Sequence, residues 1–143
     1  MRVFIGIKIG EELQKKILEW EKNYKNLPVR WLAPENLHIT LIPPWEENII
    51  EKAKGKLESI KKGKFEIVFD KISFGPDSRY PRLIWAEGNL FHLTLARFDP
   101  KKFKDFPIKK LNEKVDWQEK VSEVCLFQSF PNSVYKILHK VPL

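Results

Sequence analysis

Hydrophobic and polar residues alternate in several short segments of the chain, a pattern typical of β-strands with one buried face. The clearest case is residues 3–9, where Val3, Ile5, Ile7 and Ile9 occupy every second position. Such a run predicts a strand that packs one face against a core. The strands predicted in this way cover residues 3–9, 29–32, 37–42, 65–74, 83–86, 91–98, 120–127 and 134–141.

Two segments instead repeat apolar residues at intervals of three and four, which is the pattern of an amphipathic helix. The first predicts a helix that begins at about residue 11 and is ended by Leu27 and Pro28. The second predicts a helix over residues 48–61. Both would place one apolar stripe against a sheet.

Prolines and charges interrupt the pattern. Pro43 and Pro44 are expected to stop the strand at residues 37–42. Residues 101–116 are polar and rich in lysine, and fit either a short helix or an exposed loop. Because strands outnumber helices without a regular strand-helix rhythm, the sequence predicts an α+β protein with mainly antiparallel sheet. A chain of 143 residues suits a single domain.

Charge and cysteine content narrow the class of protein. Lys and Arg total 26 against 19 Asp and Glu, which gives a net charge of +7. A net positive charge attracts polyanions, of which nucleic acid is the commonest. A lysine-rich surface can also have no role other than to keep the protein soluble. The single cysteine, Cys125, excludes a disulfide within the chain and favours a reducing compartment, so we expect a cytoplasmic protein. The sequence has no run of 18 apolar residues and no signal-peptide pattern, so we expect no membrane attachment.

One short motif occurs twice. His38-Ile39-Thr40-Leu41 and His92-Leu93-Thr94-Leu95 both read His, aliphatic, Thr, Leu, and each lies in a predicted strand. Residues two apart on a strand face the same side, so each motif places an imidazole beside a hydroxyl. The chain contains only two threonines, and both follow a histidine in this way.

Two such histidines facing one another form a complete acid–base pair. Imidazole titrates near neutral pH, so one ring can accept a proton while the other donates one. Threonine hydroxyls beside them would stabilise charge developing between the rings. An acid and a base on opposite sides of one tetrahedral centre suit in-line displacement at phosphorus. The motif supplies no carboxylate or thiolate for a metal, and the chain has no glycine-rich phosphate loop.

The paired motifs resemble the His-x-Thr-x signature of the two-histidine (2H) phosphoesterase superfamily. The flanking sequence is similar to one branch of it, the RNA 2′,3′-cyclic phosphodiesterases, which are also called 2′-5′ RNA ligases. The similarity covers residues 30–41, 81–86, 92–97 and 126–129, followed by Tyr135, and so spans nearly the whole chain.

This resemblance implies one domain over residues 1–143, with two pseudo-symmetric lobes of mainly antiparallel sheet, helices outside and a central cleft. It implies hydrolysis of RNA 2′,3′-cyclic phosphate ends to 2′-phosphates, and 2′-5′ ligation where an RNA 5′-hydroxyl replaces water. His38 would be the proton donor and His92 the proton acceptor, while Thr40 and Thr94 would hold the phosphoryl oxygens. We expect a monomer that needs neither a metal nor another cofactor.

Two further residues are candidates for substrate binding. Arg97 suits a phosphate by its chemistry and by the resemblance, but it lies five positions after His92, and an odd offset in a regular strand puts it on the other face. A β-bulge would reconcile the two. Trp45 lies beside two prolines, and of the tryptophans we expect it to be the exposed one, able to stack on a base.

The sequence also departs from the family pattern. Only three residues separate Gly88 from His92, where the family usually has a longer segment, so we expect a reduced second lobe and a more open cleft. Phe91 replaces the usual proline before the second histidine, and residues 42–45 replace the usual continuation of the first motif. Two alternatives therefore stay open, namely a non-catalytic RNA-binding module of the same fold and a phosphodiesterase for a small cyclic nucleotide.

Overall fold

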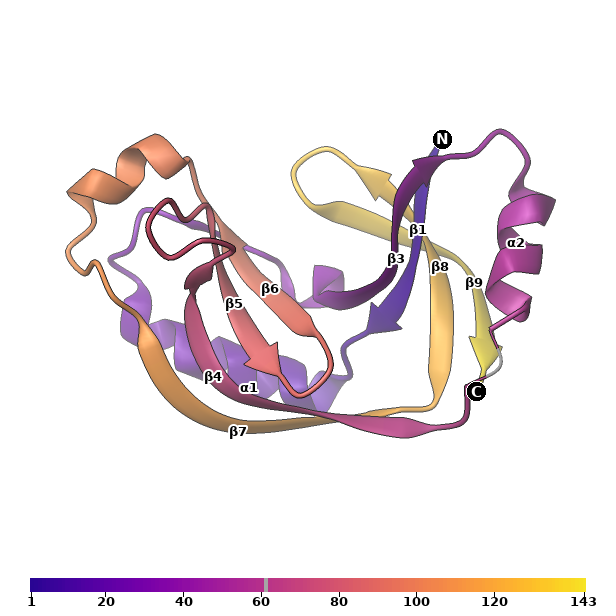
Figure 1. The fold of residues 1–143 in the computed structure, drawn as a ribbon, viewed down its shortest axis with the longest axis horizontal. Coiled ribbons are helices and arrows are strands. Elements are labelled where there is room, and N and C mark those ends of the chain that lie inside the picture. Colours follow the sequence, from indigo (N-terminus) through magenta and orange to yellow (C-terminus); the bar gives the residue numbers. More distant parts are fainter. Residues whose placement is uncertain (61) are drawn as a thin grey trace.

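The computed structural model describes residues 1–60 and 62–143, which form two antiparallel sheets (Figure 1). The first sheet has the order β3-β1-β8-β9, with β1 (Arg2–Lys8), β3 (His38–Glu46), β8 (Glu123–Phe130) and β9 (Val134–Pro142). The second has the order β2-β6-β5-β4-β7, with β2 (Arg30–Trp31), β4 (Phe65–Gly75), β5 (Leu83–Gly88), β6 (His92–Arg97) and β7 (Asn112–Val121).

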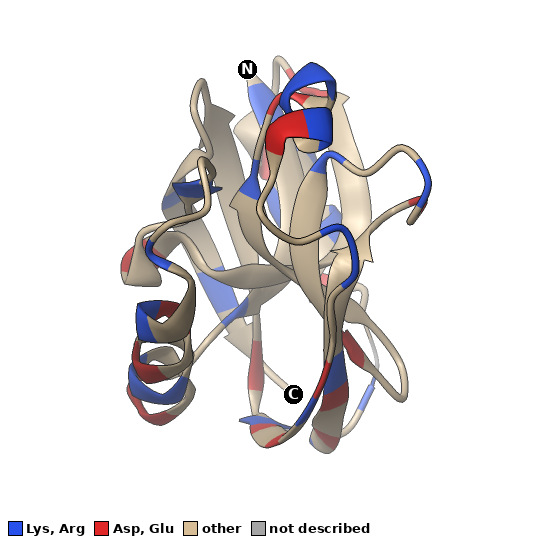
Figure 2. Ribbon diagram, turned by 90° about the vertical axis from the view of Figure 1, so that its left-hand side faces the viewer, with Lys and Arg blue, Asp and Glu red and all other residues tan. Residues whose placement is uncertain are grey.

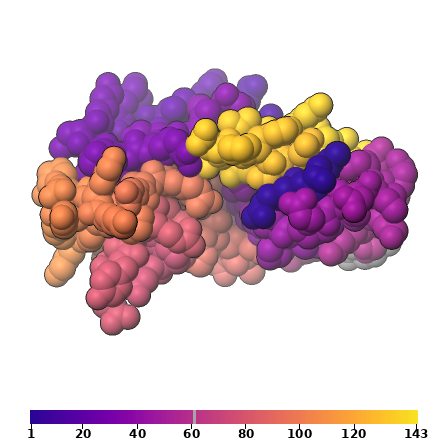
Figure 3. Space-filling view, turned by 90° about the horizontal axis from the view of Figure 1, so that it is seen from above, coloured from indigo at the N-terminus to yellow at the C-terminus, as the bar shows by residue number. Residues whose placement is uncertain are grey.

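Each sheet is covered by one α-helix, which makes two lobes side by side (Figures 1 and 3). Helix α1 (Glu11–Glu21) packs on the second sheet, where Trp20 meets Trp117 of β7 edge to face with ring centroids 6.3 Å apart. Helix α2 (Ile50–Glu58) packs on β8 and β9 through Ala53 and Leu57. The predicted α+β fold with two lobes of mainly antiparallel sheet is confirmed.

Strand β3 continues through the two prolines, so the expectation that they end it at residue 42 was wrong. The reason is position, because β3 is the edge strand of its sheet and proline is tolerated on an edge. The pairing with β1 shifts register between Val3, opposite Trp45, and Ile5, opposite Ile42, which accommodates the extra residue.

Residues 101–116 divide between two elements. The 3-10 helix η3 (Pro100–Asp105) fits the short-helix alternative, but β7 begins at Asn112, well before the strand expected from residue 120. Val115, Trp117 and Val121 alternate along its inner side. The strand was missed because the positions between them are charged or polar, as suits the solvent face of an edge strand.

The remaining elements lie close to expectation. Strand β4 covers the predicted strand over residues 65–74 and has a register shift between Phe69 and Lys71. Helix α2 is shorter than the predicted helix over residues 48–61, and Lys61 itself lies outside the described residues. Two 3-10 helices flank the short strand β2: η1 (Lys22–Tyr24) and η2 (Pro34–Asn36).

The lobes are joined tightly at one place. Strand β7 of the second sheet ends at Val121 and β8 of the first sheet begins at Glu123, so Ser122 alone connects them. The carbonyl of Ser122 also accepts a hydrogen bond from the amide of Leu143. In the described part of the chain, no helix is long and apolar enough to span a membrane.

Candidate active site

The two His-x-Thr motifs meet in one cavity of about 370 Å³. His38 and Thr40 reach it from β3 of the first sheet, and His92 and Thr94 reach it from β6 of the second sheet. Residues 54 positions apart in the sequence therefore lie around one space between the lobes. Its volume falls in the usual range for small-ligand sites, about 300–1,000 Å³.

His38 is half-buried on the cleft-facing side of the first sheet. Its ring contacts Phe4 and Phe127, and Tyr135 of β9 meets it edge to face with centroids 4.5 Å apart. Nδ1 lies 2.9 Å from the carbonyl oxygen of Asn36. Because a carbonyl only accepts, Nδ1 carries the hydrogen, and Nε2 is the nitrogen left for proton exchange in the cavity.

The charge on His38 is sensitive to its surroundings. Burial lowers the pKa of His38 below its ordinary value of 6.5, and the nearby positive charge of Arg97 lowers it further. The hydrogen bond to the Asn36 carbonyl opposes both effects. His38 is therefore mainly neutral at neutral pH, and the hydrogen bond of Nδ1 to Asn36 leaves Nε2 as the nitrogen with the lone pair.

His92 is more exposed, with 51% of its side chain accessible, and it lies at the start of β6. Its ring stacks on the indole of Trp85, with centroids 3.9 Å apart and planes inclined by 19°. Its Nε2 is 3.9 Å from Oε1 of Glu87, the residue directly opposite on β5. The short β5–β6 hairpin thus brings a carboxylate beside this histidine.

Trp85 is itself held in place. Its indole N–H donates to the Ser73 hydroxyl at 3.1 Å, and that hydroxyl donates to Glu87 at 3.0 Å. Gly75 of β4 leaves room for the indole, because a Cβ at this position would collide with the ring. The surface under His92 is therefore fixed by β4 as well as β5.

Arg97 lines the same cavity as both histidines, despite its odd spacing from His92. The pairing of β5 with β6 shifts register, because Ile84 lies opposite Ala96 and Trp85 opposite Thr94. Leu95 is the extra residue, so β6 contains the bulge that brings Arg97 to the cavity side.

Other residues at this cavity were not singled out as site residues from the sequence. Arg82 adds a second guanidinium, and Leu90 and Phe91 from the β5–β6 hairpin add apolar surface. Arg82 lies next to Leu83, which pairs with Arg97. Arg82 lies in the segment over residues 81–86 that resembles the family, but a single sequence does not reveal the pairing that brings it to the cavity.

Trp45 is not among the residues that line this cavity. It lies near the other end of β3, where its indole N–H donates to Glu47 at 3.3 Å and Lys56 covers its ring at 4.5 Å from the centroid. Trp45 is half-buried against the core, so the expectation that it is exposed was wrong, and its part in substrate binding stays a prediction. The third histidine, His139 on β9, pairs instead with Glu58 of α2 at 3.4 Å.

Nowhere in residues 1–60 or 62–143 do three or more His, Cys, Asp or Glu side chains cluster as they would to hold a metal ion.

Comparison with known families assigns the chain to one of them. Residues 7–85, which are 79 of the 143, match the family described as LigT like Phosphoesterase. The chain belongs to the LigT-like phosphoesterase family. The match contains the first His-x-Thr motif and ends before the second, and it confirms the resemblance to the 2H phosphoesterases.

Two curated relatives of this LigT-like chain are archaeal. The RNA 2′,3′-cyclic phosphodiesterase of Archaeoglobus fulgidus is 27% identical over 106 residues, which cover 69% of this chain and 60% of the relative. The protein of the same name from Methanocaldococcus jannaschii is 29% identical over 87 residues, which cover 59% of this chain and 49% of the relative. The chain therefore spans about half to three-fifths of the length of these relatives.

Solved structures show the same fold over the whole chain. The crystal structure of TT0787 of Thermus thermophilus aligns with a TM-score of 0.79 at 18% identity, covering 100% of this chain and 98% of that one. E. coli LigT complexed with ATP aligns with a TM-score of 0.75 at 23% identity, covering 99% and 96%. The two-lobed architecture is thus that of known LigT structures.

Proposed function

We propose that this LigT-like protein hydrolyses the 2′,3′-cyclic phosphate at an RNA 3′ end to a 2′-phosphate. The observation that carries the proposal is the convergence of two His-x-Thr pairs, from separate sheets, on one cavity that also contains Arg97. Two relatives bear the name of this activity, and the net charge of +7 suits an RNA substrate.

The mechanism needs two proton transfers. His92 takes a proton from water as the water oxygen attacks phosphorus, and the bond from phosphorus to the ribose 3′ oxygen breaks. His38 donates the proton on Nε2 to that departing oxygen. Each transfer contributes about 10²–10⁴-fold to the rate. For this role His38 must start protonated, and a bound phosphate anion favours that state by opposing Arg97.

The other residues stabilise charge on the phosphoryl group. The hydroxyls of Thr40 and Thr94 donate hydrogen bonds to the non-bridging oxygens of the phosphoryl group, and Arg97 balances the negative charge on those oxygens. If the 5′-hydroxyl of a second RNA replaces water, the same transfers join it to phosphorus and leave a 2′-5′ linkage. No step calls for a metal or another cofactor.

The test uses a short RNA that ends in a 2′,3′-cyclic phosphate, incubated in EDTA. We expect a product with a 2′-monophosphate, and a fall in rate of about 100-fold or more for His38→Ala and for His92→Ala. His139→Ala is the matched control, because His139 pairs with Glu58 away from the cavity, and it should keep full activity. More than a tenth of the activity remaining in either cavity variant would contradict the mechanism.

The same assay distinguishes the two alternatives. Binding of RNA without turnover between pH 5 and 8 would indicate a non-catalytic RNA-binding module. Turnover of cyclic mononucleotides but not of oligonucleotides would indicate a small-nucleotide phosphodiesterase.

A further inference from the structure

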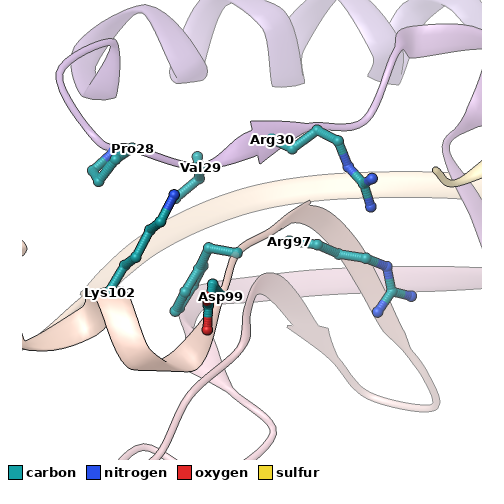
Figure 4. Close-up of a pocket in the computed structure, with 7 residues that line it drawn as sticks. Pro28, Val29, Arg30, Arg97, Asp99 and Lys102 are labelled. Carbon is teal, nitrogen blue, oxygen red and sulfur yellow. The ribbon is translucent and has the colours of Figure 1, made fainter.

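A second, larger cavity adjoins the candidate active site. Its volume is about 550 Å³, and Arg97 lines both cavities. Its other lining residues come from the start of β2 with the two residues before it, and from the segment that follows β6: Pro28, Val29, Arg30, Phe98, Asp99 and Lys102 (Figure 4). Three cations and one carboxylate thus line a space that continues from the phosphate site.

Two of the cations are held side by side by the second sheet. Arg30 of β2 pairs directly with Arg97 of β6, and both side chains extend in the same direction (Figure 4). Like charges directly opposite on neighbouring strands repel each other, so this pair lowers stability unless an anion lies near it. The arrangement is therefore one that an anionic ligand would stabilise.

These cations keep donors free for a ligand. Each terminal nitrogen of Arg30 donates one hydrogen bond to a neutral acceptor. Nη1 donates to Asn132 Oδ1 and Nη2 donates to Ser133 Oγ, both at 3.1 Å. A guanidinium has five N–H donors, so three remain. Within residues 1–60 and 62–143, the side chains of Arg97 and Lys102 make no hydrogen bond or ion pair. The one carboxylate, Asp99, accepts the backbone N–H of Lys101 and caps η3.

We propose that this second cavity binds the 5′-phosphate of the nucleotide that carries the cyclic phosphate, with Lys102 of η3 as its cation, while Arg30 and Arg97 extend away from Lys102 (Figure 4). In an RNA chain this group is the last internucleotide phosphodiester. The inference rests on the proposed function for the position of the cyclic phosphate, beside Arg97 in the first cavity. One nucleotide then spans the two cavities, and Arg97 lies between its two phosphates. The site favours the end of a nucleotide chain over a nucleoside with a free 5′-hydroxyl.

The test measures binding without turnover. A nucleoside 2′-monophosphate and the matching 2′,5′-bisphosphate are product analogues that differ in one phosphate, and calorimetry gives the Kd of each. We expect the bisphosphate to bind about tenfold more tightly to the unmodified protein, the usual size for one charge-assisted contact. Lys102→Gln should reduce that preference to about twofold. Lys104→Gln removes an exposed lysine of the same 3-10 helix that does not line the cavity, and should keep the tenfold preference.

Three results would overturn the proposal. They are equal affinities of the unmodified protein for the two ligands, an unchanged preference in Lys102→Gln, and an equal loss in Lys104→Gln, which would indicate a general field effect. A dinucleotide ending in a 2′-phosphate gives the contribution of a true phosphodiester, and it should bind at least as tightly as the bisphosphate. The proposed hydrolysis can fail while this preference holds, and the preference can fail while hydrolysis holds, so the two proposals are tested separately.

Discussion

His38 and His92 share a motif but occupy different surroundings. His38 is half-buried against Phe4, Phe127 and Tyr135 and lies within the influence of the Arg97 charge. His92 is exposed, stacks on Trp85 and has a carboxylate beside it. Two equal side chains with unequal neighbours suit unequal roles in proton transfer.

The effect of the Arg97 charge on the pKa of His38 should be measurable. In the free protein we expect the pKa of His38 to lie below 6.5, and Arg97→Gln should raise it, because it removes a positive charge that disfavours the imidazolium. NMR titration of the imidazole protons measures both values, and His139 serves as an internal reference. A His38 pKa that Arg97→Gln leaves unchanged would show that the two side chains do not interact.

The lowered pKa of His38 also affects stability. Because the folded chain binds this proton less readily than the unfolded chain, stability is lost as pH falls from about 6.5 through the lowered pKa. Above that range the contribution is complete. His38 therefore makes the fold less stable in mild acid.

A substrate with a sulfur leaving group distinguishes the residue that acts as the general acid from the residue that acts as the general base. A thiolate departs without protonation, so an analogue with sulfur in place of the bridging 3′ oxygen no longer needs the acid. We expect this analogue to recover about tenfold or more of the activity lost in His38→Ala and little of that lost in His92→Ala. Steady-state rates on the oxygen and sulfur substrates give the comparison. Recovery in His92→Ala instead would reverse the assignment of the two roles.

At the scale of elements, β1 and β3 approach closely beneath the first motif. Gly6 of β1 lies opposite Thr40, and a Cβ at Gly6 would collide with the carbonyl oxygen of Ile39. Gly6→Ala should therefore destabilise the fold by about 1–3 kcal/mol, because neither backbone can yield without moving β3. Urea unfolding measures the loss, and a reduced catalytic rate should accompany it.

Gly55 provides the matched control. It lies within α2, and a Cβ there would meet nothing within 4 Å. Gly55→Ala should raise stability by about 0.5–1 kcal/mol, the usual gain for a helical glycine replaced by alanine. Equal effects of the two substitutions would mean that the close approach at Gly6 is unimportant.

The end of α1 carries an acid in an unfavourable place. Burial raises the pKa of Glu21 to about 7 from 4.5, and its Oε1 has no hydrogen-bond partner among the described residues. Between those pH values the folded chain binds more protons than the unfolded chain, so stability falls as pH rises. We expect Glu21→Gln to stabilise the protein by about 1 kcal/mol at pH 8, a figure discounted for partial exposure, and little at pH 4.5. Thermal unfolding at both pH values tests this, and a gain that is independent of pH would contradict it.

Local sequence predicts the elements that depend on local pattern. Strand β1 and the His-x-Thr faces follow from alternation alone, because period two fixes which side chains share a face. The continuation of β3 past its prolines depends on having an edge position, and the bulge at Leu95 depends on pairing with β5. The local sequence of a strand determines neither its position at the edge of a sheet nor its pairing partner.

The same distinction holds for the candidate site. The histidines and threonines were found because each motif is contiguous and repeated. The pairing of Arg30 with Arg97, by contrast, joins strands 67 residues apart, and Lys102 joins them only through the path of η3. Residues that become neighbours through topology were therefore recovered only in part.

At the scale of the whole molecule, charge should control affinity for RNA. Lysines lie along α1 and η3 together with acidic residues (Figure 2), so the surface there is mixed, whereas the second cavity is lined by three cations and one carboxylate. Each phosphate neutralised on a single strand contributes about 0.7 to the slope of log Kd against log salt concentration. We expect Lys102→Gln to reduce that slope by about 0.7–1 for an oligonucleotide ending in a 2′-phosphate.

Titration of a labelled oligonucleotide by fluorescence anisotropy, at several salt concentrations, gives the slope. Lys104→Gln again serves as the control for loss of a surface charge. A slope that does not change in Lys102→Gln would mean that this lysine makes no phosphate contact.

The single residue between β7 and β8 has a consequence for how this architecture varies. Ser122 is the whole connection between β7 of one sheet and β8 of the other, and each sheet carries one of the histidines. One residue inserted there would have to be absorbed where the two sheets meet, without touching either imidazole. The hairpin tip between Gly88 and His92 is held by β4, because the amide of Asn89 donates to the Val68 carbonyl and the Val68 amide donates to Asn89 Oδ1. Chain length is thus constrained in two different ways, by a connection of one residue at Ser122 and by hydrogen bonds to a neighbouring strand at the hairpin tip.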